Sequence, residues 1–161
     1  MEKSRQFLFP RTLAKILPNI AAAEGIWLED ESGHRYMDAS GGAVVVNVGH
    51  GRAEIAKAVH DQILKHDYIH PTMFNAPVVA ELAGGLAAHA PEGIDRFYFL
   101  ASGSEAVEAS IKLARQIHLA NGRPERFRLV SRWKSYHGLT LGALSAMGRT
   151  AFRTPYAPML N

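Results

Sequence analysis

Two short motifs combine residue types that bind a phosphate group and a flat ring. The first, Ser102-Gly103-Ser104-Glu105, follows an apolar run and opens a helical pattern. Ser102 and Glu105 have the spacing of a helix capping box, and the N–H groups at a helix start attract a phosphate. Gly103 permits close approach of the backbone, and Ser104 adds a hydroxyl. An ordinary capped helix would show the same residues, and capping alone accounts for Glu105.

The second motif, Tyr136-His137-Gly138, follows another apolar run at residues 127–130. Both runs are typical of buried strands, and ligands in open α/β sheets bind beyond the carboxyl ends of the strands. We therefore expect the two motifs to face each other. A phosphate on the helix start and a ring stacked on Tyr136 would use both of them.

The segments that carry these motifs predict an α/β fold. Strands over residues 96–101 and 126–132 flank a helix over residues 103–120, an order that implies a right-handed crossover and parallel pairing. A further helical stretch is expected near residues 139–147, followed by a loop-like end over residues 154–161.

The first half of the chain is expected to hold a β-hairpin and two helices, joined by turns and loops. Gly33 marks the hairpin turn, and the helices follow from apolar residues at helical spacing. In chain order we expect an arm over residues 1–24, hairpin strands at 26–29 and 35–37, a small-residue loop over 40–51, and helices over 53–65 and 78–88.

Composition excludes several classes of protein. The 161 residues carry a net charge of +3 without a Lys/Arg-rich run, so we expect no nucleic-acid partner. The absence of cysteine excludes disulfides and thiolate metal sites. Neither a signal-type apolar stretch nor a run long enough to cross a membrane is present, so we expect a cytoplasmic protein without a membrane partner.

Two other kinds of site fit the sequence less well. His66 and His70 are four residues apart with His60 nearby, a spacing seen in zinc sites, but Pro71 breaks the helix at once, so no metal site is expected. A dinucleotide site would need a second and a third glycine after Gly103. His50, between two glycines, is interpreted as a loop residue near a pocket.

The order and spacing of the motifs resemble the N-terminal part of a class III aminotransferase, of the pyridoxal-phosphate fold-type-I superfamily. The resemblance covers nearly the whole chain. It rests on Gly25-Ile26-Trp27-Leu28, Tyr36-Met37-Asp38-Ala39-Ser40-Gly41-Gly42, Asn47-Val48-Gly49-His50-Gly51, Ser102-Gly103-Ser104-Glu105-Ala106 and Ser135-Tyr136-His137-Gly138.

The resemblance implies pyridoxal 5'-phosphate as the cofactor. The positions that hold its phosphate and ring in the family match Ser102, Gly103, Ser104, Tyr136, His137 and Gly138. Tyr136 would stack on the ring, and a loop that borders the substrate pocket in the family matches Ser40, Gly41 and Gly42.

The chain departs from the family in length, because it stops at Asn161. The Schiff-base lysine and the carboxylate that pairs with the pyridine nitrogen lie in the family's later sequence, so neither catalytic group is expected here. Lys134 is the one lysine near the expected site, and we interpret it as a charged surface residue. Lys112 follows Glu108 by four residues, the spacing of a surface ion pair.

The resemblance also implies an organisation and an activity. Residues 1–50 would form the N-terminal small-domain arm and hairpin, and residues 51–161 an incomplete start of the large cofactor-binding domain. The complete enzyme would move an amino group from an amine or ω-amino acid to an oxo acid. It would be a homodimer with residues 68–74 near the interface.

This segment alone is expected to be inactive, because it lacks both catalytic groups. A truncated sheet would expose an edge and an apolar face, so the segment is not expected to fold as an isolated monomer. The alternative is a truncated, non-catalytic paralogue or fragment. It would bind a phosphate-bearing ligand or only assemble with partner chains.

Overall fold

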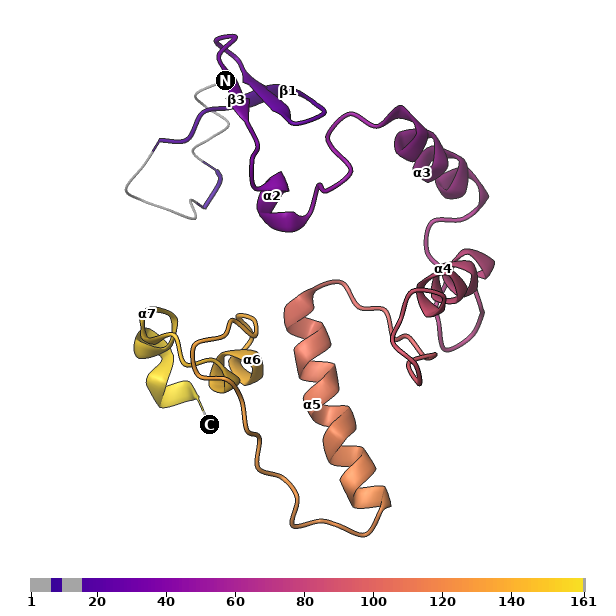
Figure 1. Ribbon diagram of the computed structural model, residues 1–161, viewed down its shortest axis with the longest axis vertical. Helices are drawn as coiled ribbons and strands as arrows, with labels where there is room; N and C mark the ends of the chain where they lie inside the picture. Colours follow the sequence, from indigo (N-terminus) through magenta and orange to yellow (C-terminus); the bar gives the residue numbers. More distant parts are fainter. Residues whose placement is uncertain (1–6, 10–15, 161) are drawn as a thin grey trace. The chain divides into compact units, whose positions relative to one another are not determined.

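The computed structural model describes residues 7–9 and 16–160, and its chain divides into two compact units, Met1–Ala76 and Pro77–Asn161. Figure 1 shows the elements of each unit along the chain. Much of the expected N-terminal arm, residues 1–6 and 10–15, and the terminal Asn161 lie outside the described residues. The domain boundary expected near residue 50 stays a prediction.

A three-stranded antiparallel sheet forms the start of the first unit. Its strands are β1 (Ile20–Glu24), β2 (Trp27–Asp30) and β3 (Arg35–Met37), in the order β1-β2-β3. The expected hairpin is therefore present, with Leu28 of β2 opposite Tyr36 of β3. The strand β1 was not expected, because its three alanines carry little strand propensity and its pairing with β2 decides its conformation.

Asp30 holds the turn between β2 and β3. Its carboxylate accepts hydrogen bonds from the Ser32 N–H at 2.9 Å, the Ser32 hydroxyl at 2.6 Å and the Tyr36 hydroxyl at 2.8 Å. The His34 N–H donates a further bond at 3.0 Å. The hydroxyls of Ser32 and Tyr36 are the main cause that holds the pKa of Asp30 well below its usual range.

Two helical segments follow the sheet. The first, α2 (Gly41–Val44), is a single left-handed turn within the segment expected to be a loop. The second, α3 (Ala53–Lys65), is the expected amphipathic helix, with Lys57 and Asp61 paired at 2.6 Å. Its apolar residues Ile55, Val59 and Ile63 remain about half exposed.

The second unit is helical. It comprises α4 (Pro77–Ala87), α5 (Gly103–Ala120), α6 (Leu141–Ala146), α7 (Thr150–Arg153) and the 3-10 helix η1 (Thr154–Met159). The helices expected over residues 78–88, 103–120 and 139–147 are therefore present. The loop-like end expected over residues 154–161 is instead largely η1, with Pro155 in its first turn.

The two strands expected over residues 96–101 and 126–132 are absent from the described part of the chain. Both segments lack regular structure, and Figure 1 shows the second as the long connection between α5 and α6. A strand exists only with a hydrogen-bonded neighbour, and neither segment has one among the described residues. The expected parallel pairing was therefore wrong for this chain.

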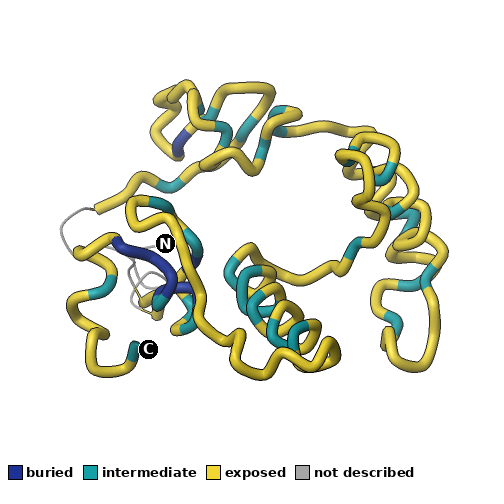
Figure 2. The backbone as a smooth tube through the Cα atoms, turned by 60° about the horizontal axis from the view of Figure 1, so that its bottom comes forward, coloured by how far each residue is buried: buried dark blue, intermediate teal, exposed yellow. Residues whose placement is uncertain are grey.

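The buried core is small and lies in and beside α6. Ala143, Leu144, Ala146 and Met147 are its buried apolar residues, drawn dark blue in Figure 2. Apolar side chains of the two missing strands remain exposed, with Val130 at 93% and Tyr98 at 80%. No helix in the described ranges is both long and apolar enough to cross a bilayer.

Candidate cofactor and substrate site

The start of α5 has the geometry that the sequence predicts. Ser102 adopts an extended backbone at φ −150° and its hydroxyl accepts a hydrogen bond from the Glu105 N–H at 3.2 Å. This is the capping contact, and it leaves other N–H groups of the first turn without an acceptor inside the helix. The helix dipole adds partial positive charge at the same place. The turn can therefore bind an anion.

The structure brings the two sequence motifs together. The Ser104 hydroxyl accepts a hydrogen bond from the Leu139 N–H at 3.0 Å. Gly138 lies so close that an added Cβ would be 2.7 Å from the Ser104 hydroxyl oxygen and 2.9 Å from the Ala143 Cβ. Its φ of 130° also disfavours any other residue. Ser104 still has its own hydroxyl proton to donate to a ligand.

Tyr136 presents a partly exposed ring beside this contact. Its exposed fraction is 53%, and the Arg149 guanidinium lies 5.9 Å from the ring centroid, within cation–π range. The Nε2 atom of His137 lies 3.4 Å from the Arg132 carbonyl oxygen. The sequence did not predict that Arg149 contacts Tyr136, because Arg149 follows α6 and no local pattern connects the two residues.

Glu108 fastens α6 to α5. Its Oε1 accepts hydrogen bonds from the Gly142 N–H at 2.9 Å and the Ala143 N–H at 3.2 Å, so it caps the start of α6. The adjacent Thr140 hydroxyl and these N–H groups lower the pKa of Glu108, outweighing the opposing effect of burial. The Lys112 charge lowers this pKa further. The expected ion pair between Glu108 and Lys112 is not found among the described residues, and the carboxylate bonds to α6 instead.

Arg153 holds the other end of α6. Its Nη1 donates to the carbonyl oxygens of Leu144 at 3.2 Å, Ser145 at 2.6 Å and Met147 at 2.7 Å. The Leu144 carbonyl also accepts the Met147 N–H at 3.1 Å, and carbonyls at a helix end depend on such partners from outside the regular helix bonds. Glu108 and Arg153 therefore fix α6 from both ends, and α6 follows directly on the Tyr136 motif.

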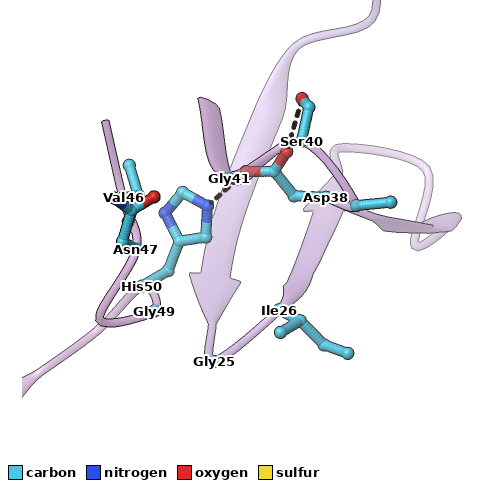
Figure 3. Close-up of a pocket in the computed structure, with 10 residues that line it drawn as sticks. Gly25, Ile26, Asp38, Ser40, Gly41, Val46, Asn47, Gly49 and His50 are labelled. Carbon is cyan, nitrogen blue, oxygen red and sulfur yellow. Dashed lines mark hydrogen bonds and ion pairs between the residues drawn. The ribbon is translucent and has the colours of Figure 1, made fainter. Parts of the chain in front are cut away.

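The other predicted residues lie in the first unit. A pocket of about 290 Å³, shown in Figure 3, is lined by Gly25, Ile26, Asp38, Ala39, Ser40, Gly41, Val46, Asn47, Gly49 and His50. Ser40 and Gly41 thus line it, and Gly42 follows them in the same turn. His50 lies in its wall, as the sequence led us to expect.

Asp38 lines this pocket, and the sequence motif that contains it did not predict a role for its carboxylate. Its Oδ1 accepts hydrogen bonds from the Gly42 N–H at 3.1 Å and the Ser40 hydroxyl at 3.3 Å, and its Oδ2 lies 3.0 Å from His50 Nε2. The Gly42 N–H is the largest of the causes that lower the pKa of Asp38. An Asp two residues before a Ser-Gly-Gly stretch is the signal that could have identified it.

Comparison with known proteins identifies the family. Residues 9–161 match the family described as aminotransferase class III. An uncharacterised aminotransferase of Bacillus subtilis is 42% identical, over 85% of this chain and 30% of its own length. The putrescine–pyruvate aminotransferase of Pseudomonas aeruginosa is 35% identical, over 82% of this chain and 29% of its own.

Solved structures agree with these relatives. An (S)-enantioselective omega-transaminase from Thermomicrobium roseum superimposes with a TM-score of 0.87 at 35% identity, over 93% of this chain and 35% of its own. The chain spans about a third of the length of these proteins. Its fold is the N-terminal segment of the fold-type-I transaminases. The chain belongs to the class III aminotransferase family.

Proposed function

We propose that this chain is the N-terminal part of a pyridoxal-phosphate-dependent transaminase. The enzyme moves an amino group from an amine or ω-amino acid to an oxo acid. The bond from the Leu139 N–H to the Ser104 hydroxyl carries the proposal, because it joins the anion-binding turn to the Tyr136 motif. Relatives with omega-aminotransferase and putrescine–pyruvate aminotransferase activity support the class of substrates.

The residues present fit this cofactor. Ser102, Gly103 and Ser104 supply a capped helix start and a hydroxyl proton for its phosphate. The ring of Tyr136 is exposed enough to stack on a pyridine ring, with His137 and Gly138 beside it. When bound, pyridoxal phosphate supplies an electron sink for the substrate's reacting carbon.

The groups that would complete the chemistry are proposed to lie outside residues 1–161. These are the lysine that carries the cofactor and the carboxylate that keeps the pyridine nitrogen protonated. Lys134 is exposed, which fits a charged surface residue. We therefore expect the 161-residue chain alone to be inactive.

The remaining parts of the proposal concern substrate and assembly. Ser40, Gly41 and Gly42 border the substrate pocket. The enzyme is a cytoplasmic homodimer, with residues 68–74 near the subunit interface. Tyr68, Met73 and Phe74 support an interface there, because their apolar side chains are about two-thirds exposed or more.

A second candidate is a truncated chain without catalysis. The small buried core around Met147 and the exposed apolar residues of segments 96–101 and 126–132 favour it. Such a chain would bind a phosphate-bearing ligand or only assemble with partner chains.

A cofactor titration tests the proposal. The protein, expressed from its complete reading frame, is titrated with pyridoxal phosphate and assayed with an amine donor and pyruvate. Ser104→Ala should weaken cofactor binding about tenfold, the effect of one hydrogen bond to a charged group. Ser110→Ala is the matched control, because Ser110 also lies on α5 and its hydroxyl donates to the Val107 carbonyl of the same helix.

Two results would contradict the transaminase. One is a wild-type protein that neither binds the cofactor nor transfers an amino group. The other is equal cofactor affinity in the Ser104→Ala and Ser110→Ala variants. Cofactor binding without any amino transfer would favour the non-catalytic candidate.

A further inference from the structure

The turn α2 has a backbone that L-amino acids rarely adopt. Gly41 and Gly42 have φ of 54° and 59°, and the two residues after them, Ala43 and Val44, have φ of 63° and 67°. Left-handed conformation is free for glycine but unfavourable for a residue with a Cβ, and most unfavourable for a β-branched one. Val44 is therefore strained, and something must hold it in place.

Packing of the Val44 and Val45 side chains does not hold the turn. Val44 is 76% exposed and Val45 is 79% exposed. The backbone hydrogen bonds of the turn are local. The Val44 N–H donates to the Ser40 carbonyl at 2.8 Å, and the Gly41 N–H donates to the Asp38 carbonyl at 3.1 Å. The one side-chain acceptor for the turn among these contacts is the Asp38 carboxylate, which takes the Gly42 N–H.

Asp38 and His50 are both anchored to the link between β1 and β2. The Asp38 N–H donates to the Ile26 carbonyl at 2.8 Å. His50 and Gly25 exchange two backbone hydrogen bonds, at 2.8 and 3.0 Å. Figure 3 shows the His50 ring pointing at the Asp38 carboxylate, which faces Ser40 and Gly41. The sheet therefore fixes the pair, and the pair fixes the turn.

The pair is shielded from solvent. The side chain of Asp38 is 10% exposed and that of His50 is 21% exposed. Hydrogen bonds shielded in this way lose little to competition from water. Strained backbone that is held by its surroundings clusters at functional sites, and this turn lines a pocket.

We propose that Asp38 and His50 are positioning residues of the transaminase, forming a clasp that holds Gly41–Val44 left-handed and so shapes the substrate-pocket wall. This inference rests on the proposed function, which places Ser40, Gly41 and Gly42 at that pocket. Neither residue needs to touch the reacting atoms, because both act through the turn.

Steady-state kinetics test the role of the clasp. In the protein expressed from its complete reading frame, Asp38→Ala should raise KM for the amino donor about tenfold and change kcat less than about twofold. A pocket wall contributes binding that is equal in the ground and transition states. Asp38→Asn should recover most of the KM, because its amide oxygen can still accept the Gly42 N–H. Asp95→Ala, at an exposed acid of the second unit, is the control.

A glycine pair tests the strained turn directly. Val44→Gly should raise the melting temperature, because glycine accepts the positive φ without strain. Val45→Gly should lower it, because Val45 has an ordinary φ of −104° and nearly the same exposure. Val44→Gly should also lower KM when added to Asp38→Ala, since the turn then needs less support. This pair remains decisive if Asp38→Ala does not fold.

The outcomes separate the two proposals. Wild-type protein without amino transfer refutes the proposed function and, with it, the role of the clasp. Active wild type with an unchanged KM in Asp38→Ala refutes the clasp alone. So does a Val44→Gly variant that melts as low as Val45→Gly.

Discussion

At the scale of single residues, the candidate cofactor site depends on a close approach that only glycine allows. Gly138 brings the Tyr136 loop onto the Ser104 hydroxyl, where any side chain would collide. A carboxylate plays the equivalent part in the first unit, where Asp30 satisfies the N–H and hydroxyl groups of the hairpin turn. Gly138 and Asp30 both act by fixing the position of nearby backbone, rather than by packing a side chain into a core.

Gly138→Ala should therefore weaken pyridoxal phosphate binding by about tenfold or more, because the new Cβ pushes the Tyr136 loop off Ser104. Isothermal titration measures the change. Gly85→Ala in α4 is the matched control, since a Cβ there meets nothing within 4 Å. It should keep the affinity and stabilise the helix by about 0.5–1 kcal/mol. Equal affinity in the two variants would show that the approach at Gly138 is unimportant.

Asp30 predicts how the sheet responds to acid. Its pKa is lowered in the folded chain, chiefly by the Ser32 and Tyr36 hydroxyls, so its bonds stabilise the fold above the unfolded pKa of about 3.9. That stabilisation is lost as pH falls through the lower, folded pKa. The melting temperature should drop below about pH 4 in wild type and depend less on pH in Asp30→Asn. Parallel pH curves for the two proteins would contradict the assignment.

At the scale of elements, α6 is the part that connects the site to the fold. It carries the buried residues Ala143, Leu144 and Ala146, and Glu108 of α5 caps its start. Arg153 caps its end. A six-residue helix is too short to be stable by itself, so these contacts and its burial must stabilise it.

Glu108→Ala should destabilise the second unit by about 1 kcal/mol, the typical effect of removing a helix cap. Glu108→Gln should recover most of the loss, because the Gln oxygen still accepts a hydrogen bond. Chemical denaturation measures both, and Glu81→Ala in α4 is the control for removing an exposed helical glutamate. A Gln variant as unstable as the Ala variant would mean that charge, rather than the hydrogen bonds, matters.

Local patterns predicted the elements that local contacts form. The helices α3, α4 and α5 follow from apolar spacing and from the Ser102 cap, and the β2–β3 hairpin follows from its turn. Residues 96–101 and 126–132 have the same apolar signal as a strand, but a strand also needs a neighbour. The apolar pattern of one segment does not show whether a neighbouring strand is present to pair with it.

The missed parts of the site have a related cause. The sequence spacing pairs Glu108 with Lys112 on its own helix, whereas the hydrogen-bond partners of Glu108 lie on α6. The Asp38–His50 pair joins residues twelve apart in sequence through a turn whose left-handed form involves Ala43 and Val44. Neither alanine nor valine predicts that conformation, so periodicity offered no signal for it.

At the scale of the whole molecule, the chain carries candidate cofactor-binding residues and much uncovered apolar surface. The anion-binding turn and the Tyr136 motif are joined, while Tyr98, Val130 and their neighbours lie exposed. Burying such side chains is worth about 25 cal/mol per Å² of apolar surface, so the proposed transaminase should cover them with further polypeptide or a partner chain. Relatives roughly three times as long have the chain to do so.

The most direct test of this account maps the site of cofactor attachment. The protein, expressed from its complete reading frame, is incubated with pyridoxal phosphate, reduced with borohydride and analysed by peptide mass mapping. The account predicts one phosphopyridoxyl group, attached to a lysine outside residues 1–161, and none on the 161-residue chain by itself. A stable adduct on Lys134, or no adduct on any lysine, would contradict it.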